Sequence, residues 1–157
     1  MAPLIFLIVT FGITALADRY FLKGRLGLSL AGRIAMAVML LVTGITHFTN
    51  TDEMIKMMPD PMPWKREMVY FTGVCEFLAI PGLIWERTRR LAAILLIVFF
   101  VAVLPANVVG SMKQVQMGGM EYGTVYLWFR VPLQIFFIWW TWYFALRLPK
   151  GDRPSRQ

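Results

Sequence analysis

The sequence is poor in the side chains that build disulfides and metal centres. Among its 157 residues, Cys75 is the single cysteine and His47 is the single histidine. One cysteine can form neither an intrachain disulfide nor a CxxC redox pair, and it cannot build a thiolate metal cluster. One histidine excludes bis-histidine haem within one chain and any multi-histidine metal site. We therefore expect no metal site and no thiol-relay chemistry.

Charged residues are also scarce, at 16% of the chain, whereas hydrophobic residues make up 58% and the mean hydropathy is +0.60. A soluble domain of this length cannot cover so much apolar surface, which predicts an integral membrane protein of the all-α class. The absence of an internal repeat favours a single membrane domain over residues 1–157. The net charge of +7 comes from cations in short runs between apolar segments. Such runs indicate membrane topology, and we expect no nucleic-acid partner.

Five apolar runs are long enough to cross a bilayer as helices. We expect a membrane helical bundle with spans at residues 4–22, 28–48, 68–85, 91–110 and 125–146. An alternative for the first run is a cleaved signal peptide, because residues 15–17 resemble a cleavage site, although no basic segment precedes it. Residues 49–67 are polar and proline-rich, which predicts an external loop or lid. Residues 147–157 form a basic tail.

Lysine and arginine are distributed unevenly between the two predicted sides of the membrane. One side receives eleven, from the linker before the second span, the turn before the fourth and the tail, whereas the other side receives four. Basic residues are enriched in cytoplasmic loops. We therefore expect a multi-pass protein of the cytoplasmic membrane, with the lipid bilayer around it, the N-terminus outside and the C-terminus in the cytoplasm.

Two charges interrupt the apolar runs, Glu76 in the third and Arg130 in the fifth. Each would cost about 2.5–3.5 kcal/mol at the centre of a bilayer, so both should point into the bundle rather than at lipid. Their similar inferred depth predicts that they pair there. Protonation of Glu76 is the alternative that removes its charge.

Further polar residues fall at a similar depth on other helices. His47 and Asn107 lie near the outer ends of the second and fourth spans, and no comparable set is expected in the inner half. Residues four apart share a helix face, which adds Tyr126 and Gln134 to the face of Arg130 and places Thr43 with His47 and Thr72 with Glu76. We expect one outward-facing pocket, and its candidate ligand-binding residues are His47, Glu76, Asn107, Arg130, Gln134 and Tyr126. Gly44 and Gly73, beside these stripes, should let neighbouring helices approach closely.

The eleven methionines do not indicate a copper site by themselves, because a soft-metal site needs sulfur atoms that converge. We expect them to face lipid or to fill gaps between helices.

Several fragments, taken in order and spacing, resemble the DoxX-like (DoxX/DoxD-like) family of small bacterial membrane proteins. They are GITHF at residues 44–48, MMPDPMPW at 57–64, GVCEFLAIPGLIW at 73–85, LPANV at 104–108 and FRVPLQ at 129–134. The resemblance covers roughly residues 33–146 and implies a four-helix core, here preceded by an extra N-terminal span. Its relatives include a subunit of a thiosulfate:quinone oxidoreductase and members linked to membrane oxidoreductase complexes. It therefore implies a redox setting, although most members have no established biochemical activity.

A quinone suits the predicted pocket, because its tail needs an apolar slot and its carbonyls need hydrogen-bond donors and a proton carrier. We expect binding of a quinone or a similar amphipathic molecule within a membrane redox system, with a redox partner protein or a homo-oligomer. Whether the chain is itself an enzyme stays open, and no catalytic residue is assigned. The main alternative is a non-enzymatic assembly or chaperone-like subunit whose polar layer is structural or grips a partner helix. A small-solute transporter is disfavoured by the lack of repeats.

Overall fold

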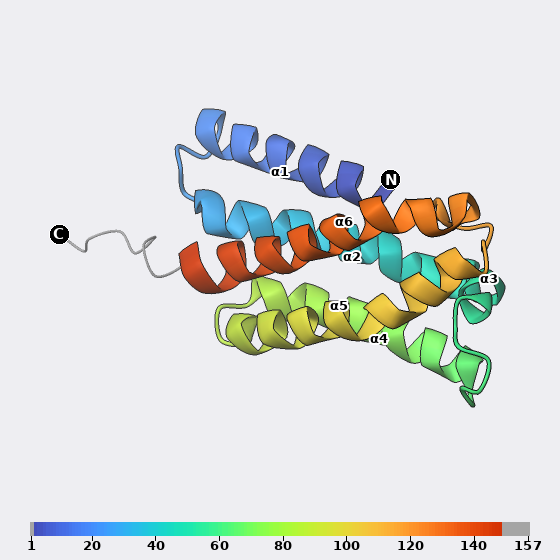
Figure 1. The fold of residues 1–157 in the computed structure, drawn as a ribbon. Helices are drawn as coiled ribbons and strands as arrows, with labels where there is room; N and C mark the ends of the chain where they lie inside the picture. The colour runs from blue at the N-terminus through green and yellow to red at the C-terminus, as the bar shows by residue number, and fades with distance from the viewer. Residues whose placement is uncertain (1, 149–157) are drawn as a thin grey trace.

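The computed structural model describes residues 2–148, and these form helices joined by short connections, without a β-strand (Figure 1). The predicted all-α class is confirmed for this part of the chain. The elements in order are α1 (Ala2–Tyr20), α2 (Gly27–Thr49), α3 (Thr51–Lys56), α4 (Lys65–Ile84), α5 (Arg89–Met112), the 3₁₀ segment η1 (Met120–Tyr126), α6 (Leu127–Thr141) and the π-helical segment η2 (Trp142–Arg147).

Four helices in the described region, α1, α2, α4 and α5, are long and apolar enough to cross a membrane. They match the first four predicted spans to within a few residues at each end. The fifth predicted run, residues 125–146, is divided among the end of η1, α6 and η2, and α6 alone has 15 residues. The predicted loop at residues 49–67 contains the short helix α3. Residues 149–157 of the predicted basic tail lie outside the described part.

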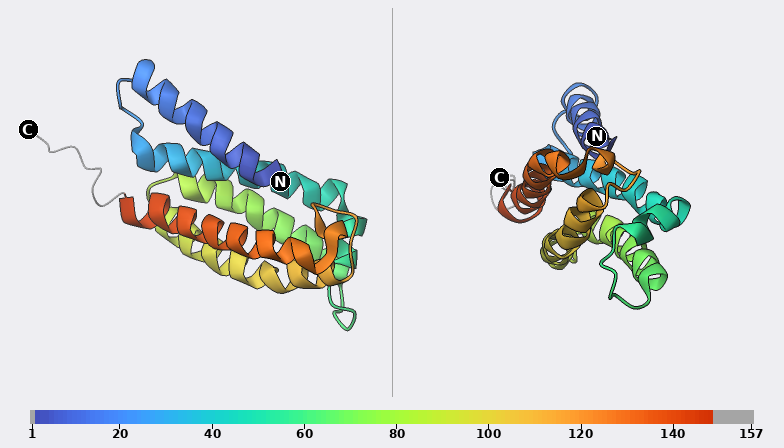
Figure 2. Two further views of the ribbon diagram at one scale, coloured as in Figure 1. Left: turned by 45° about the horizontal axis from the view of Figure 1, so that its top comes forward. Right: turned by 45° about the vertical axis from the view of Figure 1, so that its right-hand side comes forward.

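The long helices run roughly along one common direction and alternate in sense (Figure 1). One end of the bundle carries α3 and the connection between α5 and α6, and we call it the α3 end. The opposite end carries the α1–α2 and α4–α5 turns; we call it the basic end, after Arg19, Lys23, Arg25, Arg87 and Arg90. Both views of Figure 2 keep this arrangement, with α1 on the outside of the bundle beside α2.

Helix α2 is the centre of the bundle. In its most apolar stretch 56% of the residues are buried, against 11% in α1, which exposes most of its apolar surface. The core joins small and large apolar side chains of several helices, including Ala35, Met36, Met39 and Leu40 of α2, Leu83 of α4, Leu96 and Phe100 of α5, Phe137 and Trp140 of α6, and Phe144 of η2. Exposed apolar side chains on α1, α4 and α5 are what a helix presents to lipid.

Apolar packing and hydrogen bonds attach α1 to the rest of the bundle. The Phe11 ring meets the Trp140 ring edge-on, with 5.1 Å between centroids. At the basic end the Asp18 carboxylate accepts hydrogen bonds from the backbone N–H groups of Leu26 (2.9 Å) and Gly27 (3.0 Å). Those donors belong to the start of α2, where the helix itself offers them no acceptor. Asp18 therefore fixes the turn and the beginning of the central helix together.

Close packing between α2 and α4 depends on two glycines. A Cβ at Gly44 would lie 2.8 Å from the Phe77 ring, and one at Gly73 would lie 2.7 Å from the His47 Cβ. Real Cβ atoms do not approach so closely, so any larger residue would push the helices apart. The predicted role of Gly44 and Gly73 is confirmed, and their absent side chains allow the polar stripes of α2 and α4 to meet.

The basic end holds a polar cluster between the buried Arg33 and the exposed Glu86, and the prediction that this half contains no comparable set was wrong. Arg33, only 4% exposed, donates from Nε to the Ser29 carbonyl (3.3 Å), from Nη1 to the Leu83 carbonyl (3.1 Å) and from Nη2 to the Glu86 carboxylate (2.6 Å). Arg89 approaches the other Glu86 oxygen at 2.8 Å. The prediction failed because it counted Arg33 among the cations of the linker before the second span. Arg33 lies inside α2 instead, and its side chain is buried in the bundle.

Candidate functional site

A cavity of about 350 Å³ lies within the half of the bundle toward the α3 end. All six predicted ligand-binding residues line it: His47 from α2, Glu76 from α4, Asn107 from α5, Tyr126 from η1, and Arg130 and Gln134 from α6. Most of the remaining lining is apolar, and its volume lies at the lower end of the range for small-molecule sites. Residues from five elements thus line one cavity, as their inferred depths predicted.

The wall formed by α2 and α4 is a cross-linked pair of polar stripes. The Thr43 hydroxyl of α2 donates to Glu76 Oε2 of α4 at 2.7 Å. The second contact joins the other members of the two stripes, since Thr72 Oγ1 of α4 lies 3.1 Å from His47 Nδ1 of α2. Since the two helices run antiparallel, the i and i+4 members of each stripe meet the other stripe in reverse order. The polar residues predicted to share a face of one helix therefore contact the polar residues of the neighbouring helix.

The proton position on His47 follows from its neighbours. His47 Nδ1 lies 3.0 Å from the Val69 carbonyl oxygen, which can only accept, so Nδ1 carries a hydrogen. In the neutral ring Nε2 then presents a lone pair, and it lies 3.6 Å from Glu76 Oε1. This separation is longer than a hydrogen bond, so the two side chains face each other on this wall without direct contact between these two atoms.

The facing wall, from α5 and α6, supplies hydrogen-bond donors. The Asn107 amide donates to the Val103 carbonyl within its own helix (3.1 Å), which turns its oxygen toward Arg130 Nη2 at 3.3 Å. Gln134 Nε2 donates to the Phe100 carbonyl at 2.7 Å and so holds α6 against α5. Arg130 Nε is buried without a hydrogen-bond partner among residues 2–148. The guanidinium therefore keeps unused donors.

The predicted direct pair between Glu76 and Arg130 is not formed. Over the described residues no carboxylate lies within 4.0 Å of the Arg130 guanidinium, and the Glu76 oxygens face Thr43 and His47 instead. Depth along a helix can be counted from the sequence, but the direction that a side chain takes around the helix axis depends on packing. The two groups share the cavity from different walls.

Methionines form much of the end of the cavity toward α3, which the sequence interpretation missed. Five of the eleven line it, from α3, from the residues just after α3 and from the segment around η1: Met54, Met57, Met58, Met117 and Met120. Flexible thioether side chains adapt to ligands of different shape. Two of them, Met57 and Met120, pack over Gly110 of α5. Their shared approach to one helix end was not visible from sequence spacing.

An ion-pair cluster holds the loop beside this methionine group. Lys113, which directly follows α5, donates to Asp60 Oδ1 at 2.6 Å and to the Met58 carbonyl at 3.2 Å, and Lys65 lies 3.8 Å from the same carboxylate oxygen. The hydrogen bond and the positive charge of Lys113 hold the pKa of the Asp60 carboxyl below its usual range. The loop after α3 is thereby attached to the end of α5.

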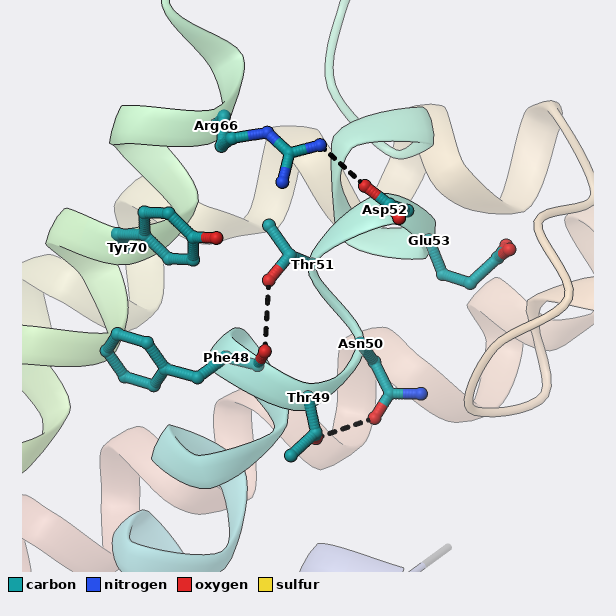
Figure 3. Close-up of a pocket in the computed structure, with 8 residues that line it drawn as sticks. All are labelled: Phe48, Thr49, Asn50, Thr51, Asp52, Glu53, Arg66 and Tyr70. Atoms are coloured by element: carbon teal, nitrogen blue, oxygen red, sulfur yellow. Dashed lines mark hydrogen bonds and ion pairs between the residues drawn. The ribbon is translucent and has the colours of Figure 1, made fainter.

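A second, more polar cavity of about 280 Å³ lies at the α3 end between the α2–α3 junction and α4 (Figure 3). Arg66 Nη2 donates to Asp52 there at 2.8 Å, and the Thr51 hydroxyl turns back to the Phe48 carbonyl. None of the six predicted residues lines it. Arg66 pairs with Asp52 inside this lining, and Glu53 pairs with Lys56 outside it, so the one cation of this cavity is already paired.

Together these features define a class: an all-helical chain with four helices fit to span a membrane and an internal, mostly apolar cavity with polar groups on two walls. Residues 2–148 contain no group of three His, Cys, Asp or Glu side chains that could hold a metal ion.

The chain belongs to the family described as "Domain of unknown function (DUF8561)", whose model matches residues 36–145. No curated protein and no solved structure matches it. The match includes all six predicted residues and begins after α1, and the resemblance to the DoxX-like family stays a prediction.

Proposed function

We propose that this protein binds a quinone or a similar amphipathic small molecule in its internal cavity, as part of a redox system of the cytoplasmic membrane. In this proposal α6 and η2 together act as the fifth span. The N-terminus and the α3 end face outward, and the basic end and the C-terminus face the cytoplasm. A redox partner protein or a second copy of the chain would complete the system, because no electron carrier is evident in the sequence.

The observation that carries the proposal is the placement of polar groups on two facing walls of one apolar cavity. A quinone ring carries two carbonyl oxygens on opposite sides. One could accept from Arg130 on the α5–α6 wall and the other could lie against His47 and Glu76 on the α2–α4 wall, while the tail lies among apolar and methionine side chains. Reduction of a quinone requires protons as well as electrons, and His47 and Glu76 are the kinds of side chain that transfer protons.

The binding test uses the purified full chain in detergent and a short-tailed quinone whose fluorescence quenching or thermal stabilisation can be titrated. We expect saturable binding, and we expect Phe100→Trp, which enlarges a lining side chain, to weaken it. Phe71→Trp, at an exposed position on α4, is the matched control. Absence of saturable binding, or equal effects of both variants, would contradict the proposal.

The orientation is tested separately by fusing alkaline phosphatase or a fluorescent protein after Gln157. Five spans with the N-terminus outside place the fusion in the cytoplasm, so fluorescence without phosphatase activity is expected. High phosphatase activity would mean either four spans or the reverse orientation. Either outcome is independent of what the cavity binds.

A non-enzymatic assembly subunit is the second candidate, and a specific observation favours it. The hydrogen bonds from Thr43 to Glu76 and from His47 to the Val69 carbonyl tie α2 to α4 directly. Buried polar contacts of this kind can specify how helices pack without taking part in chemistry. The two candidates differ in whether the cavity residues affect ligand binding or stability alone.

A further inference from the structure

The two charged side chains that line the cavity differ in how the chain holds them. The Glu76 carboxylate accepts a hydrogen bond from Thr43 at 2.7 Å, and its other oxygen lies 3.6 Å from His47 Nε2. Arg130 lies on the other wall and, among residues 2–148, has no carboxylate within 4.0 Å. Arg130 is therefore a cation of the cavity lining without a direct counter-ion in the described part of the chain.

The Arg130 guanidinium is also short of hydrogen-bond acceptors. A guanidinium offers five N–H donors in a planar fork. Of these, Nη2 meets Asn107 at the long distance of 3.3 Å, and the buried Nε has no partner among the described residues. A charge taken out of water costs several kcal/mol unless it finds an opposite charge and hydrogen bonds. A planar anionic group with two oxygens satisfies both needs at once.

We propose that the preferred ligand of the cavity is a single-chain amphiphile with an anionic head, such as a long-chain carboxylate, whose oxygens bind Arg130. The head lies at Arg130, and the chain extends among the apolar side chains and methionines of the lining. This inference rests on the proposed cavity as the binding site and narrows the ligand class from amphiphiles in general to acidic ones. A quinone with an ionised ring hydroxyl belongs to the same chemical class.

The test compares three probes that share an apolar tail but differ in the head: oleic acid, oleyl alcohol and a neutral long-tailed quinone. Binding to the purified full chain is measured at about pH 8, where a free carboxylic acid is ionised. We expect the wild-type chain to bind oleate at least about tenfold more tightly than oleyl alcohol, about 1.4 kcal/mol. This comparison needs no variant, so it stands even if a substitution prevents folding.

Two substitutions at Arg130 and an exposed control at Arg90 locate the effect. Arg130→Gln should reduce the preference for oleate over the alcohol to within about twofold, whereas Arg130→Lys, which keeps the charge but not the fork, should retain part of it. Arg90→Gln removes the same charge from an exposed position at the basic end and should leave the preference unchanged. Equal losses in Arg130→Gln and Arg90→Gln would show that oleate is attracted by the overall charge of the chain, and this would overturn the inference.

The remaining outcomes separate this inference from the proposed function. If the neutral quinone binds but oleate has no advantage over the alcohol, the anionic-head inference is overturned and the proposed quinone site survives. If oleate binds through Arg130 and the quinone does not bind, the inference holds and the quinone assignment falls. If no probe binds, both fall.

Discussion

Two arginines lie inside the helices of this bundle, and they differ in how completely the protein satisfies them. Arg33, toward the basic end, gives hydrogen bonds to two backbone carbonyls and to the Glu86 carboxylate. Arg130, toward the α3 end, has one long hydrogen bond to Asn107 and a buried Nε without a partner among residues 2–148. The first arginine is a structural tie between α2 and the end of α4. The second is a cation that faces a cavity and has donors to spare.

The comparison shows that burial of a charge does not by itself indicate function. Both arginines would be costly in lipid, and each is turned inward for that reason. What separates them is the number of acceptors that the folded chain supplies. A fully satisfied group has little left for a ligand, whereas an under-satisfied one gains from binding.

The largest expected effect is a difference in stability between variants of the two arginines. Arg33→Gln should lower the free energy of unfolding in detergent by about 3 kcal/mol, because it removes a charged pair and leaves the Leu83 carbonyl without its donor. Arg130→Gln should change it by about 1 kcal/mol or less, since few native hydrogen bonds are lost. Chemical denaturation of both variants measures the difference, with Arg90→Gln as the exposed control. Equal destabilisation by the two buried substitutions would remove the distinction.

The next effect concerns binding at the opposite wall. His47→Gln should weaken binding of a quinone or an acidic amphiphile about tenfold, about 1.4 kcal/mol, because it replaces the imidazole that lines this wall of the cavity. The melting temperature should change little, since a glutamine amide can still donate to the Val69 carbonyl. Titration and thermal unfolding of the same sample give both values. Loss of stability with normal binding by the folded fraction would favour the assembly-subunit candidate.

A smaller effect is expected from the hydrogen bond that supports Glu76. Thr43→Val keeps the shape of the side chain but removes its donation to Glu76, and it should cost about 1 kcal/mol of stability. Thr14→Val is a matched control, because the Thr14 hydroxyl bonds to the Thr10 and Phe11 carbonyls within α1. Thermal denaturation compares the two. If the control loses as much as Thr43→Val, the bond between α2 and α4 contributes nothing measurable.

The smallest effect should be confined to the loop after α3. The pKa of Asp60 is lowered by Lys113, so their contact is present above the ordinary carboxylate range and is lost as the pH falls through the lowered value. A spin label at residue 62, in a Cys75→Ala background, should therefore stay equally mobile from pH 7 down to about pH 4 and gain mobility below it. In Asp60→Asn the label should be mobile at every pH. A gain in mobility near pH 6 in the parent chain would assign the change to another group.

The sequence predicted most of the fold because hydropathy and chain length determine where membrane helices begin and end. Four predicted spans agree with α1, α2, α4 and α5 to within a few residues. The division of the last run into η1, α6 and η2 was not predictable from hydropathy, which reads the whole run as one apolar segment. Helix α3 was also missed, because its six residues lie in a segment whose prolines suggested a loop.

The candidate site was predicted in composition but not in its contacts. Counting 1.5 Å per residue places polar groups at a similar depth, and all six predicted residues do line one cavity. Rotation of each helix about its own axis decides which groups touch, and this is why Glu76 contacts His47 and Thr43 rather than Arg130. The methionines were missed for the same reason. Met57 and Met120 are 63 positions apart in the printed sequence and meet only over Gly110.

An experimental structure with ligand would show whether the Arg130 side of the cavity receives a ligand and the Arg33 cluster does not. The purified chain would be imaged in lipid nanodiscs with a long-tailed quinone or with oleate added in excess. We expect density for the head beside Arg130, with the tail toward the methionines, and no ligand density at Arg33. A cavity filled by protein side chains, with ligand density confined to the lipid-facing surface, would contradict this expectation.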